Sequence, residues 1–481
     1  MTSDWTEGYV VDVGYEAGFQ RLLAPSLIDL VLAVRGVRPV LHGRPFTYLE
    51  LGCGQGFTTN LLAAANPHGQ FRGVDFNPGH MVAARELAQA AGIGNATFSA
   101  DSFAEFLEAD TPGFDMIGLH GVWSWISEEN RRLVVDIVAR KLKLGGVLYM
   151  SYNCLPGWAA MIPLRRLVAE QGRALPGPTP ARARRMREMF ARLGELDARY
   201  LQANPAAAAR LADLRRRSVP YLAHEYLNRD WHADTFADVM RDLGPARLSW
   251  VGSARLSDHA GELSQRAEDY LGSIEDTVFR ETARDVLVNQ AFRHDVFVRG
   301  PLPLSEAARK ETLATTRLTL AAPPPEAEGP GKAILDALAS GPQPLDRLLE
   351  QSDLAALLTL VAQGAVLPAE EADAGRRAAT DRFNAVVLDR ALDLDDPPAL
   401  ASPVLGSGVA LSRLERVFLL GRRRGVADLG QFAWDQLSAI APALAEERPF
   451  EALGGTRDSL AARAQAFTTV WLPALERLGV G

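Results

Sequence analysis

Residues 48 to 56 read Tyr48-Leu-Glu-Leu-Gly-Cys-Gly-Gln-Gly56, and this stretch decides the fold. The apolar run at its start is typical of a buried strand. Three glycines then alternate, at Gly52, Gly54 and Gly56, and an Ala/Leu-rich helical pattern follows. A strand, a glycine turn and a helix N-terminus in this order let the backbone approach a bound nucleoside closely.

An acidic residue, Glu50, lies inside this motif, which reads E-x-G-x-G-x-G and not the usual dinucleotide-binding spacing. A pyrophosphate site would exclude a carboxylate that points into the pocket, whereas a cationic ligand would attract one. S-adenosylmethionine (SAM) carries a sulfonium and an ammonium and no phosphate, so we expect a ligand of this kind. The alternative, an NAD-dependent enzyme, would require a pyrophosphate loop that this stretch lacks.

Four more apolar runs predict further strands, each separated from the last by a helical pattern. The predicted strands are 71–74, 96–100, 114–119 and 146–151, and the helical stretches are 58–65, 80–91, 103–109 and 128–142. This alternation predicts an α/β fold with a parallel, doubly wound sheet. Its ligand should lie at the carboxyl ends of the strands.

Acidic residues end the second and third predicted strands. Asp75 comes 19 residues after Gly56, close to the position expected for a ribose-binding acid. Asp101 and Ser102 end the third strand, where an acid commonly meets the adenine amino group. Alternatively, Asp101 only caps the strand end, because short polar residues favour such turns.

The stretch from Tyr48 to Asn153 resembles class I SAM-dependent methyltransferases, because the glycine motif, the acids and the alternating strands agree in order and spacing. Three later runs extend the resemblance to nearly the whole chain: His120-Gly-Val-Trp-Ser-Trp-Ile126, Ser151-Tyr-Asn-Cys-Leu-Pro-Gly-Trp158 and Tyr221-Leu-Ala-His-Glu-Tyr-Leu227. They are similar to a bacterial subgroup with a "methyltransferase regulatory" domain. That subgroup includes protein-lysine methyltransferases that modify outer-membrane proteins.

The resemblance implies SAM as cofactor and a protein as substrate. That substrate could be an outer-membrane or surface protein, which the enzyme would meet before its export. It implies cofactor contacts from the residues of the glycine motif and the strand-end acids: Glu50, Gly52, Gly54, Gly56, Asp75, Asp101 and Ser102. Tyr15, in a stretch before the first strand, is a candidate flap residue over the cofactor.

Aromatic side chains follow the fourth and fifth predicted strands. An aromatic pocket would lower the pKa of a lysine amine by desolvation and would hold a methylated ammonium by cation–π contact. We take Trp125, Tyr152 and His120 as candidate catalytic residues, and Trp123 and Trp158 as candidate substrate contacts. Each aromatic residue could instead fill the core, and His120 could be a structural histidine.

Strands at 246–251 and 294–299 would complete a seven-stranded, Rossmann-like methyltransferase sheet with helical insertions. The region 332–368 has a winged-helix-like pattern, and its third helix, 353–363, lacks Lys and Arg, so groove binding to DNA is not expected. The chain beyond 381 reads as mostly helical. The expected parts are a flap and helix (1–44), a SAM-binding core (45–157), a helical insertion for dimerisation or substrate (158–230), the rest of the core sheet with a regulatory domain (231–300), a linker (301–330), a winged-helix-like domain (331–400) and a helical region (401–481).

Composition limits the functions that the chain can have. With 481 residues, of which 47% are hydrophobic, it is long enough for several globular domains. The net charge of −8 argues against nucleic acid as a partner. Two cysteines, no leader-like start and no membrane-length apolar run favour a cytoplasmic protein that is not in a membrane. No metal is expected, since His224-Glu225 lacks the second histidine of a zinc motif.

Two alternatives from other functional classes stay open. One is a small-molecule O- or N-methyltransferase, and the other is a SAM-binding regulator without catalytic activity. A homodimer formed through the insertions is a further expectation.

Overall fold

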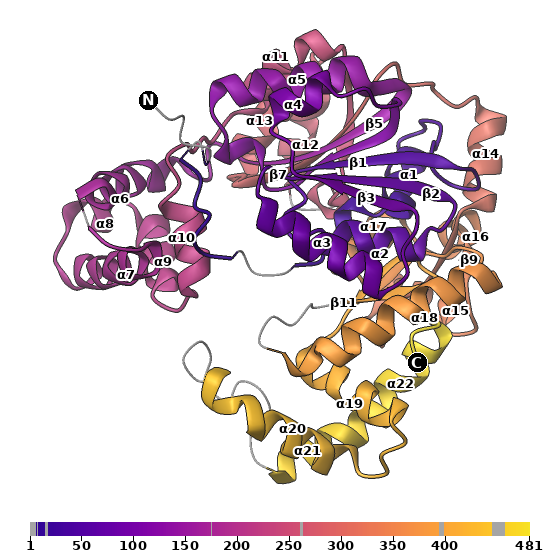
Figure 1. Cartoon of the computed structure of the whole chain (residues 1–481). Helices are drawn as coiled ribbons and strands as arrows, with labels where there is room; N and C mark the ends of the chain where they lie inside the picture. The colour runs from indigo at the N-terminus through magenta and orange to yellow at the C-terminus, as the bar shows by residue number, and fades with distance from the viewer. Residues whose placement is uncertain are drawn as a thin grey trace.

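The computed structural model describes residues 6, 8–14, 18–174, 176–259, 263–393, 399–444 and 457–481. Figure 1 shows an α/β part around one sheet, a helical lobe that projects from it, and a C-terminal part that curves beneath the helices of the sheet. No helix in these ranges is both long and apolar enough to cross a bilayer.

The central sheet has seven strands in the order β3-β2-β1-β4-β5-β7-β6. They are β1 (Phe46–Leu51), β2 (Gly69–Val74), β3 (Ala96–Ser99), β4 (Phe114–Leu119), β5 (Leu142–Asn153), β6 (Ser249–Ser253) and β7 (Phe292–Val298). The first five strands pair in parallel, which confirms the fold class expected from the sequence. β7 runs antiparallel between β5 and β6, an orientation that the sequence pattern did not predict.

Helices cover both faces of the sheet because its strand residues alternate between two cores. Tyr48 of β1 packs in one core with α1 (Pro25–Val34) and α2 (Phe57–Ala65), whereas its neighbour Leu49 packs in the other. That second core includes residues of α5 (Glu128–Lys141) and α11 (Phe236–Asp242). The remaining helices of this part are α3 (Pro78–Ala90), α4 (Phe103–Glu108), α12 (Gln265–Gly272) and α13 (Thr277–Val288). This is a doubly wound arrangement.

Five helices between β5 and β6 form the lobe, with an apolar core of their own. They are α6 (Ile162–Ala174), α7 (Thr179–Glu195), α8 (Arg199–Ala203), α9 (Pro205–Leu214) and α10 (Val219–Tyr226). Three of these helices, α7, α8 and α9, lie around Pro205. α7 ends at Glu195, and Pro205 starts α9 at a position where its missing N–H costs nothing.

The region after β7 contains the helices and strand that the winged-helix-like pattern predicted. It has α14 (Glu306–Thr315), β8 (Arg317–Leu320), α15 (Gly329–Leu338), β9 (Gln343–Pro344), α16 (Leu345–Gln351), α17 (Leu354–Gln363) and β10 (Val366–Pro368). β10, β8 and β9 form a small sheet.

The last part is mostly helical but holds a hairpin that the sequence pattern missed. Its elements are α18 (Ala374–Asp389), β11 (Ala399–Ser402), β12 (Ser407–Ala410), α19 (Arg413–Arg423), α20 (Leu429–Leu444), α21 (Arg457–Ala466) and α22 (Leu472–Arg477). The hairpin strands are four residues each, so their pattern is too short to stand out.

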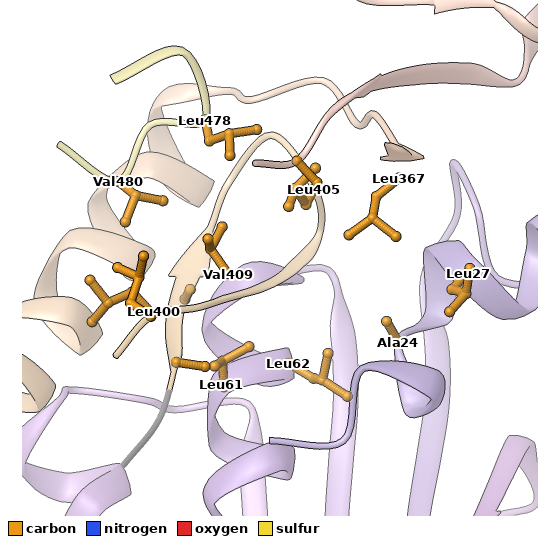
Figure 2. Packing of buried hydrophobic residues seen from close by; sticks show 14 of the residues in the cluster. Ala24, Leu27, Leu61, Leu62, Leu367, Leu400, Leu405, Val409, Leu478 and Val480 are labelled. Atoms are coloured by element: carbon orange, nitrogen blue, oxygen red, sulfur yellow. The ribbon is translucent and has the colours of Figure 1, made fainter. Parts of the chain in front are cut away.

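Figure 2 shows that this hairpin packs directly on the sheet domain. Leu400 and Val409 of the hairpin lie beside Leu61 and Leu62 of α2, all within one buried cluster. The Asn66 amide at the end of α2 also donates to the Gly406 carbonyl over 2.8 Å. The linker expected at 301–330 therefore does not separate a tail that is free of the sheet domain.

Candidate functional site

A cavity of about 330 Å³ lies at the carboxyl ends of the central strands. The loops after β1, β2, β3 and β4 line it, together with residues from the N-terminal segment and from α10. This is the edge where doubly wound sheets bind their ligands, and the volume lies in the usual range of ligand pockets.

The glycine loop after β1 forms one wall of the cavity. Gly52, Gly54 and Gly56 all have positive φ angles, of 71°, 53° and 68°. A Cβ atom on Gly54 would meet nothing within 4 Å, so a side chain there would occupy cavity space that a ligand needs. Gly56 differs, because its Cβ would come within 2.6 Å of Ala84 and 2.8 Å of Phe98. Gly56 does not line the cavity, so its expected cofactor contact is corrected to close packing of α2 against α3.

Asp75 lies at the end of β2 and joins the two loops that bound the cavity. Its Oδ2 accepts a hydrogen bond from the Gly54 amide at 2.9 Å, and its Oδ1 accepts one from the Asn77 amide at 3.0 Å. The Nδ1 of His80 lies 3.2 Å from Oδ1. Two backbone donors fix the carboxylate, which retains acceptor capacity for the hydroxyls of a ribose.

Glu50 lines the cavity from the end of β1, with only 5% of the residue exposed. Thr59 Oγ1 donates to its Oε2 at 2.5 Å. Burial raises the pKa of Glu50 to about 7, and the nearby charge of Asp75 adds to this rise. A bound cation would favour the ionised carboxylate, so this residue fits the sulfonium and ammonium of SAM.

Asp101 and Ser102 both line the cavity after β3, but their side chains differ in freedom. Ser102 is the N-cap of α4, where its hydroxyl accepts from the Glu105 amide and donates to the Glu105 carboxylate. Its side chain is therefore already engaged within the helix cap. Asp101 is not the cap residue, and its carboxylate, 30% exposed, has Arg72 at 3.9 Å. Asp101 thus remains available to a ligand.

His120 ends β4 and lines the cavity, with a chain of hydrogen bonds behind it. Its Nδ1 lies 2.8 Å from the Tyr149 hydroxyl, which lies 3.0 Å from Nδ1 of His294. Ser151 Oγ is a second neighbour of the His120 Nδ1, at 3.3 Å. Burial lowers the pKa of His120 to about 3, so its ring is neutral near pH 7 and is a weak base.

Of the four aromatic candidates, only Trp125 lines the cavity. It ends the short 3-10 helix η2 (Trp123–Trp125), whereas Trp123 is fully buried under α5 with Arg131 4.7 Å from its ring. Trp158 is buried in the lobe, with Arg210 3.6 Å from its ring centre. The expected substrate contacts from Trp123 and Trp158 are therefore corrected to packing roles.

Tyr152 is also outside the cavity. It is completely buried in the core that includes α11, and its hydroxyl donates to Asp295 Oδ2 at 2.7 Å. Its neighbour Ser151 faces His120, and successive strand residues point to opposite faces, so Tyr152 points away from the site. The expected catalytic role of Tyr152 is corrected to a structural one.

Residues of the N-terminal segment line part of the cavity, whereas Tyr15, the expected flap residue, lies outside the described residues. Tyr9 lines the cavity, and its ring centre lies 6.0 Å from that of Phe76 and 5.6 Å from that of His224. The Val10 amide donates to Asn228 Oδ1 at 2.8 Å. These contacts hold the segment against the end of α10.

Sequence reasoning missed the contribution of α10 to the cavity. His224, Glu225 and Asp230 line it, although they lie more than 70 residues after β5. The signal in the sequence is Glu225 itself, an acid within the run Tyr221–Leu227 that resembles the family. Within the described ranges, no group of three or more His, Cys, Asp or Glu side chains is arranged to hold a metal ion.

Comparison with known proteins agrees with this arrangement. Residues 44–184 match the family of the methyltransferase domain, and residues 218–299 match the predicted methyltransferase regulatory domain. The uncharacterised protein sll1526 of Synechocystis is 36% identical over 504 residues, which cover 99% of each chain. PKMT2 from Rickettsia typhi shares the fold, with a TM-score of 0.70 at 19% identity over 97% of this chain and all of that one. Its complex with AdoHcy gives a TM-score of 0.67 at 18% identity, over 97% of this chain and 99% of that one.

Proposed function

Because the chain belongs to the class I SAM-dependent methyltransferases that carry a methyltransferase regulatory domain, we propose that it methylates lysine side chains of a protein. Its cofactor is SAM. When bound, SAM supplies an electrophilic methyl group, which bonds to the amine lone pair while the electron pair of the carbon–sulfur bond goes to sulfur. The protein has to bind, orient and desolvate the two partners.

The charge of the cavity lining is the observation that carries this proposal. Five carboxylates line the cavity, from Glu50, Asp75, Asp101, Glu225 and Asp230. The described residues contribute no Lys or Arg to the same lining. This surface suits two cations at once, the sulfonium of SAM and the ammonium of an acceptor, and it would repel phosphate groups.

Trp125 supports an amine acceptor in particular. Its partly buried indole lines the same cavity, where it would desolvate an alkylamine and hold the ammonium by cation–π contact. PKMT2, a protein lysine methyltransferase, shares this fold over nearly the whole chain, which favours a protein acceptor. The acceptor protein would meet the enzyme in the cytoplasm, before any export to the cell surface.

Incubating the purified protein with methyl-labelled SAM and a cell lysate tests the proposal. Label should enter the protein fraction and appear as methyl-lysine after hydrolysis. Gly54→Val, which fills ligand space, is the matched control and should abolish the transfer. Label on small molecules alone would favour a metabolite methyltransferase, and no label would favour a regulator without catalytic activity.

A further inference from the structure

Cofactor binding accounts for three of the five carboxylates in the cavity but leaves two without a role. Glu50, Asp75 and Asp101 belong to the strand ends that hold SAM. Glu225 and Asp230 come from α10 and the loop after it, within the stretch 218–299 that matches the regulatory domain. The regulatory region therefore builds part of the cavity wall itself.

The helix α10 is firmly held, so the position of Glu225 is well defined. The residue before Glu225, His224, has its Nε2 2.9 Å from the Val13 carbonyl oxygen. The residue after it, Tyr226, is completely buried, with its ring edge against Phe190 at 5.7 Å between ring centres. The carboxylate of Glu225 itself makes no hydrogen bond or ion pair within the part of the chain that the structure describes, whereas Asp230 is paired with Arg229 at 3.0 Å.

Cationic residues surround Glu225 without contacting it. Arg165 of α6, Arg210 of α9 and Arg217 attract its charge, yet burial outweighs them and raises the pKa of Glu225 to about 7. Arg165 also lies 5.9 Å from the ring centre of Trp125. Arg165 therefore lies near both the Glu225 carboxylate and the Trp125 ring.

We propose that Glu225 is the general base of this enzyme. Its carboxylate binds the lysine ε-ammonium in the cavity and removes one proton before methyl transfer. This inference rests on the proposed function. The N–H bond breaks, its electron pair stays on nitrogen, and the proton goes to a carboxylate oxygen. The products of this step are a neutral amine, ready for nucleophilic attack, and a carboxylic acid that returns its proton to water.

Glu50 also has a pKa of about 7, but its carboxylate already accepts a hydrogen bond from the Thr59 hydroxyl. Three other titratable groups of the cavity are less suited to this role. His120 is too weak a base, since the pKa of its ring lies near 3. Burial also lowers the pKa of His224, whose Nε2 is already engaged by Val13. Asp230 is held by Arg229. A general base acts best when its pKa lies near the working pH. Glu225 meets this condition, because its pKa is about 7.

Glu225→Gln tests the inference because it keeps the size of the side chain and removes its charge. The probe is N-acetyl-lysine methylamide, titrated into the protein saturated with S-adenosylhomocysteine. We expect binding of the probe to weaken about tenfold, as for a lost charged partner. Formation of methyl-lysine on lysate proteins should fall about 100-fold. The affinity for S-adenosylhomocysteine and the melting temperature should stay unchanged, as in the exposed control Glu188→Gln.

The pH profile provides a second readout. The wild-type rate should rise with pH and level off above about 7, and this inflection should be absent in Glu225→Gln. If the variant binds the probe and methylates lysine like the wild type, the inference is overturned while the proposed function stands. If the wild type methylates no lysine, the proposed function fails, and unchanged probe binding in Glu225→Gln would overturn the inference as well.

Discussion

At the scale of single residues, the main feature of the cavity is a set of carboxylates, two of which have pKa values raised by burial. Burial raises the pKa of both Glu50 and Glu225 to about 7, so either group can gain or lose a proton near neutral pH. Asp75 differs because two backbone amides and His80 already surround it. The site therefore contains one carboxylate that hydrogen bonds hold in place and two acids that a cationic ligand would ionise.

Replacing Asp75 by alanine should weaken the binding of S-adenosylhomocysteine by about 1–3 kcal/mol, because a charged hydrogen-bond partner is lost. The glycine loop would also lose the bond from the Gly54 amide. Isothermal titration measures the effect, with the exposed Asp110→Ala as the control. Equal affinity in wild type and Asp75→Ala would remove Asp75 from the cofactor site.

The binding of SAM should become weaker as the pH falls from 8 to 6. Glu50 is protonated below its pKa of about 7, and the neutral acid no longer attracts the sulfonium. Titrations across this range should show a smaller pH dependence for Glu50→Gln than for the wild type. S-adenosylhomocysteine, which lacks the sulfonium charge, should depend on pH less than SAM. Identical pH dependence in wild type and Glu50→Gln would contradict the role of Glu50.

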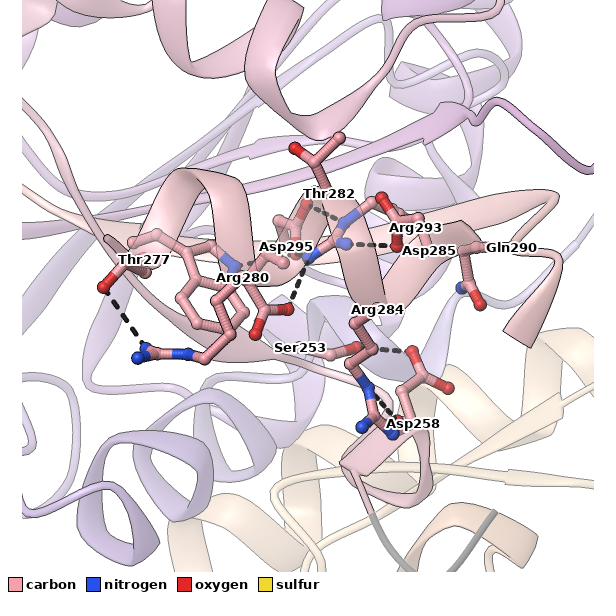
Figure 3. A network of polar contacts seen from close by, with 12 residues as sticks. Ser253, Asp258, Thr277, Arg280, Thr282, Arg284, Asp285, Gln290, Arg293 and Asp295 are labelled. Carbon is pink, nitrogen blue, oxygen red and sulfur yellow. Dashed lines mark hydrogen bonds and ion pairs between the residues drawn. The ribbon is translucent and has the colours of Figure 1, made fainter. Parts of the chain in front are cut away.

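At the scale of elements, a buried ion network ties α13 to β7 and so fixes the antiparallel strand (Figure 3). The Arg293 guanidinium lies 3.3 Å from Glu281, 2.5 Å from Asp285 and 2.8 Å from Asp295, all buried. Asp295 in turn accepts the hydroxyl of Tyr152 from β5. The network thereby connects α13 and β7 with β5.

Arg293→Met should destabilise the protein by about 3–5 kcal/mol, because it leaves three carboxylates buried without their counter-charge. Urea unfolding of the variant, compared with the exposed Arg266→Met, measures this loss. Loss of stability should be greater above pH 6 than below it, because burial raises the pKa of Asp285 to about 6 and its ionised form needs the counter-charge. An unfolding curve like that of the wild type would show that water reaches these acids.

The elements that local patterns encode were predicted well, and the ones that depend on distant packing were not. The first five strands and the glycine turn follow from runs of neighbouring residues, so the loops after these strands could be predicted to line the cavity. Tyr152 was misplaced because a shift of one residue along a strand changes the face to which a side chain points. Glu225 was missed because α10 lies more than 70 residues after β5 in the chain, and its approach to the cavity depends on how the lobe packs.

At the scale of the whole molecule, the C-terminal part belongs to the same packed body as the sheet domain. Ala24, Leu27, Leu61 and Leu62 of the sheet domain are buried in one cluster with Leu400 and other C-terminal residues (Figure 2). Separating the two parts would expose this apolar surface to water.

Removal of residues 331–481 should therefore produce an aggregating or loosely folded protein, although the expected linker at 301–330 would suggest a separable tail. Size-exclusion chromatography and thermal melting of residues 1–330 measure the outcome. The full chain with Pro324→Ser and Pro325→Ser, both exposed, is the control and should melt like the wild type. A monomeric fragment with a cooperative melt would contradict this account.

The central claim is that this cavity methylates lysine side chains of a protein. Its most direct test is mass spectrometry of lysate proteins after incubation with SAM that carries a deuterated methyl group. We predict deuterated methyl groups on lysine side chains with the wild type, a strong loss with Trp125→Ala, and retention with Tyr152→Phe, whose side chain lies outside the cavity. Deuterated methyl groups found only on carboxylates, nucleic acid or small metabolites would contradict the claim.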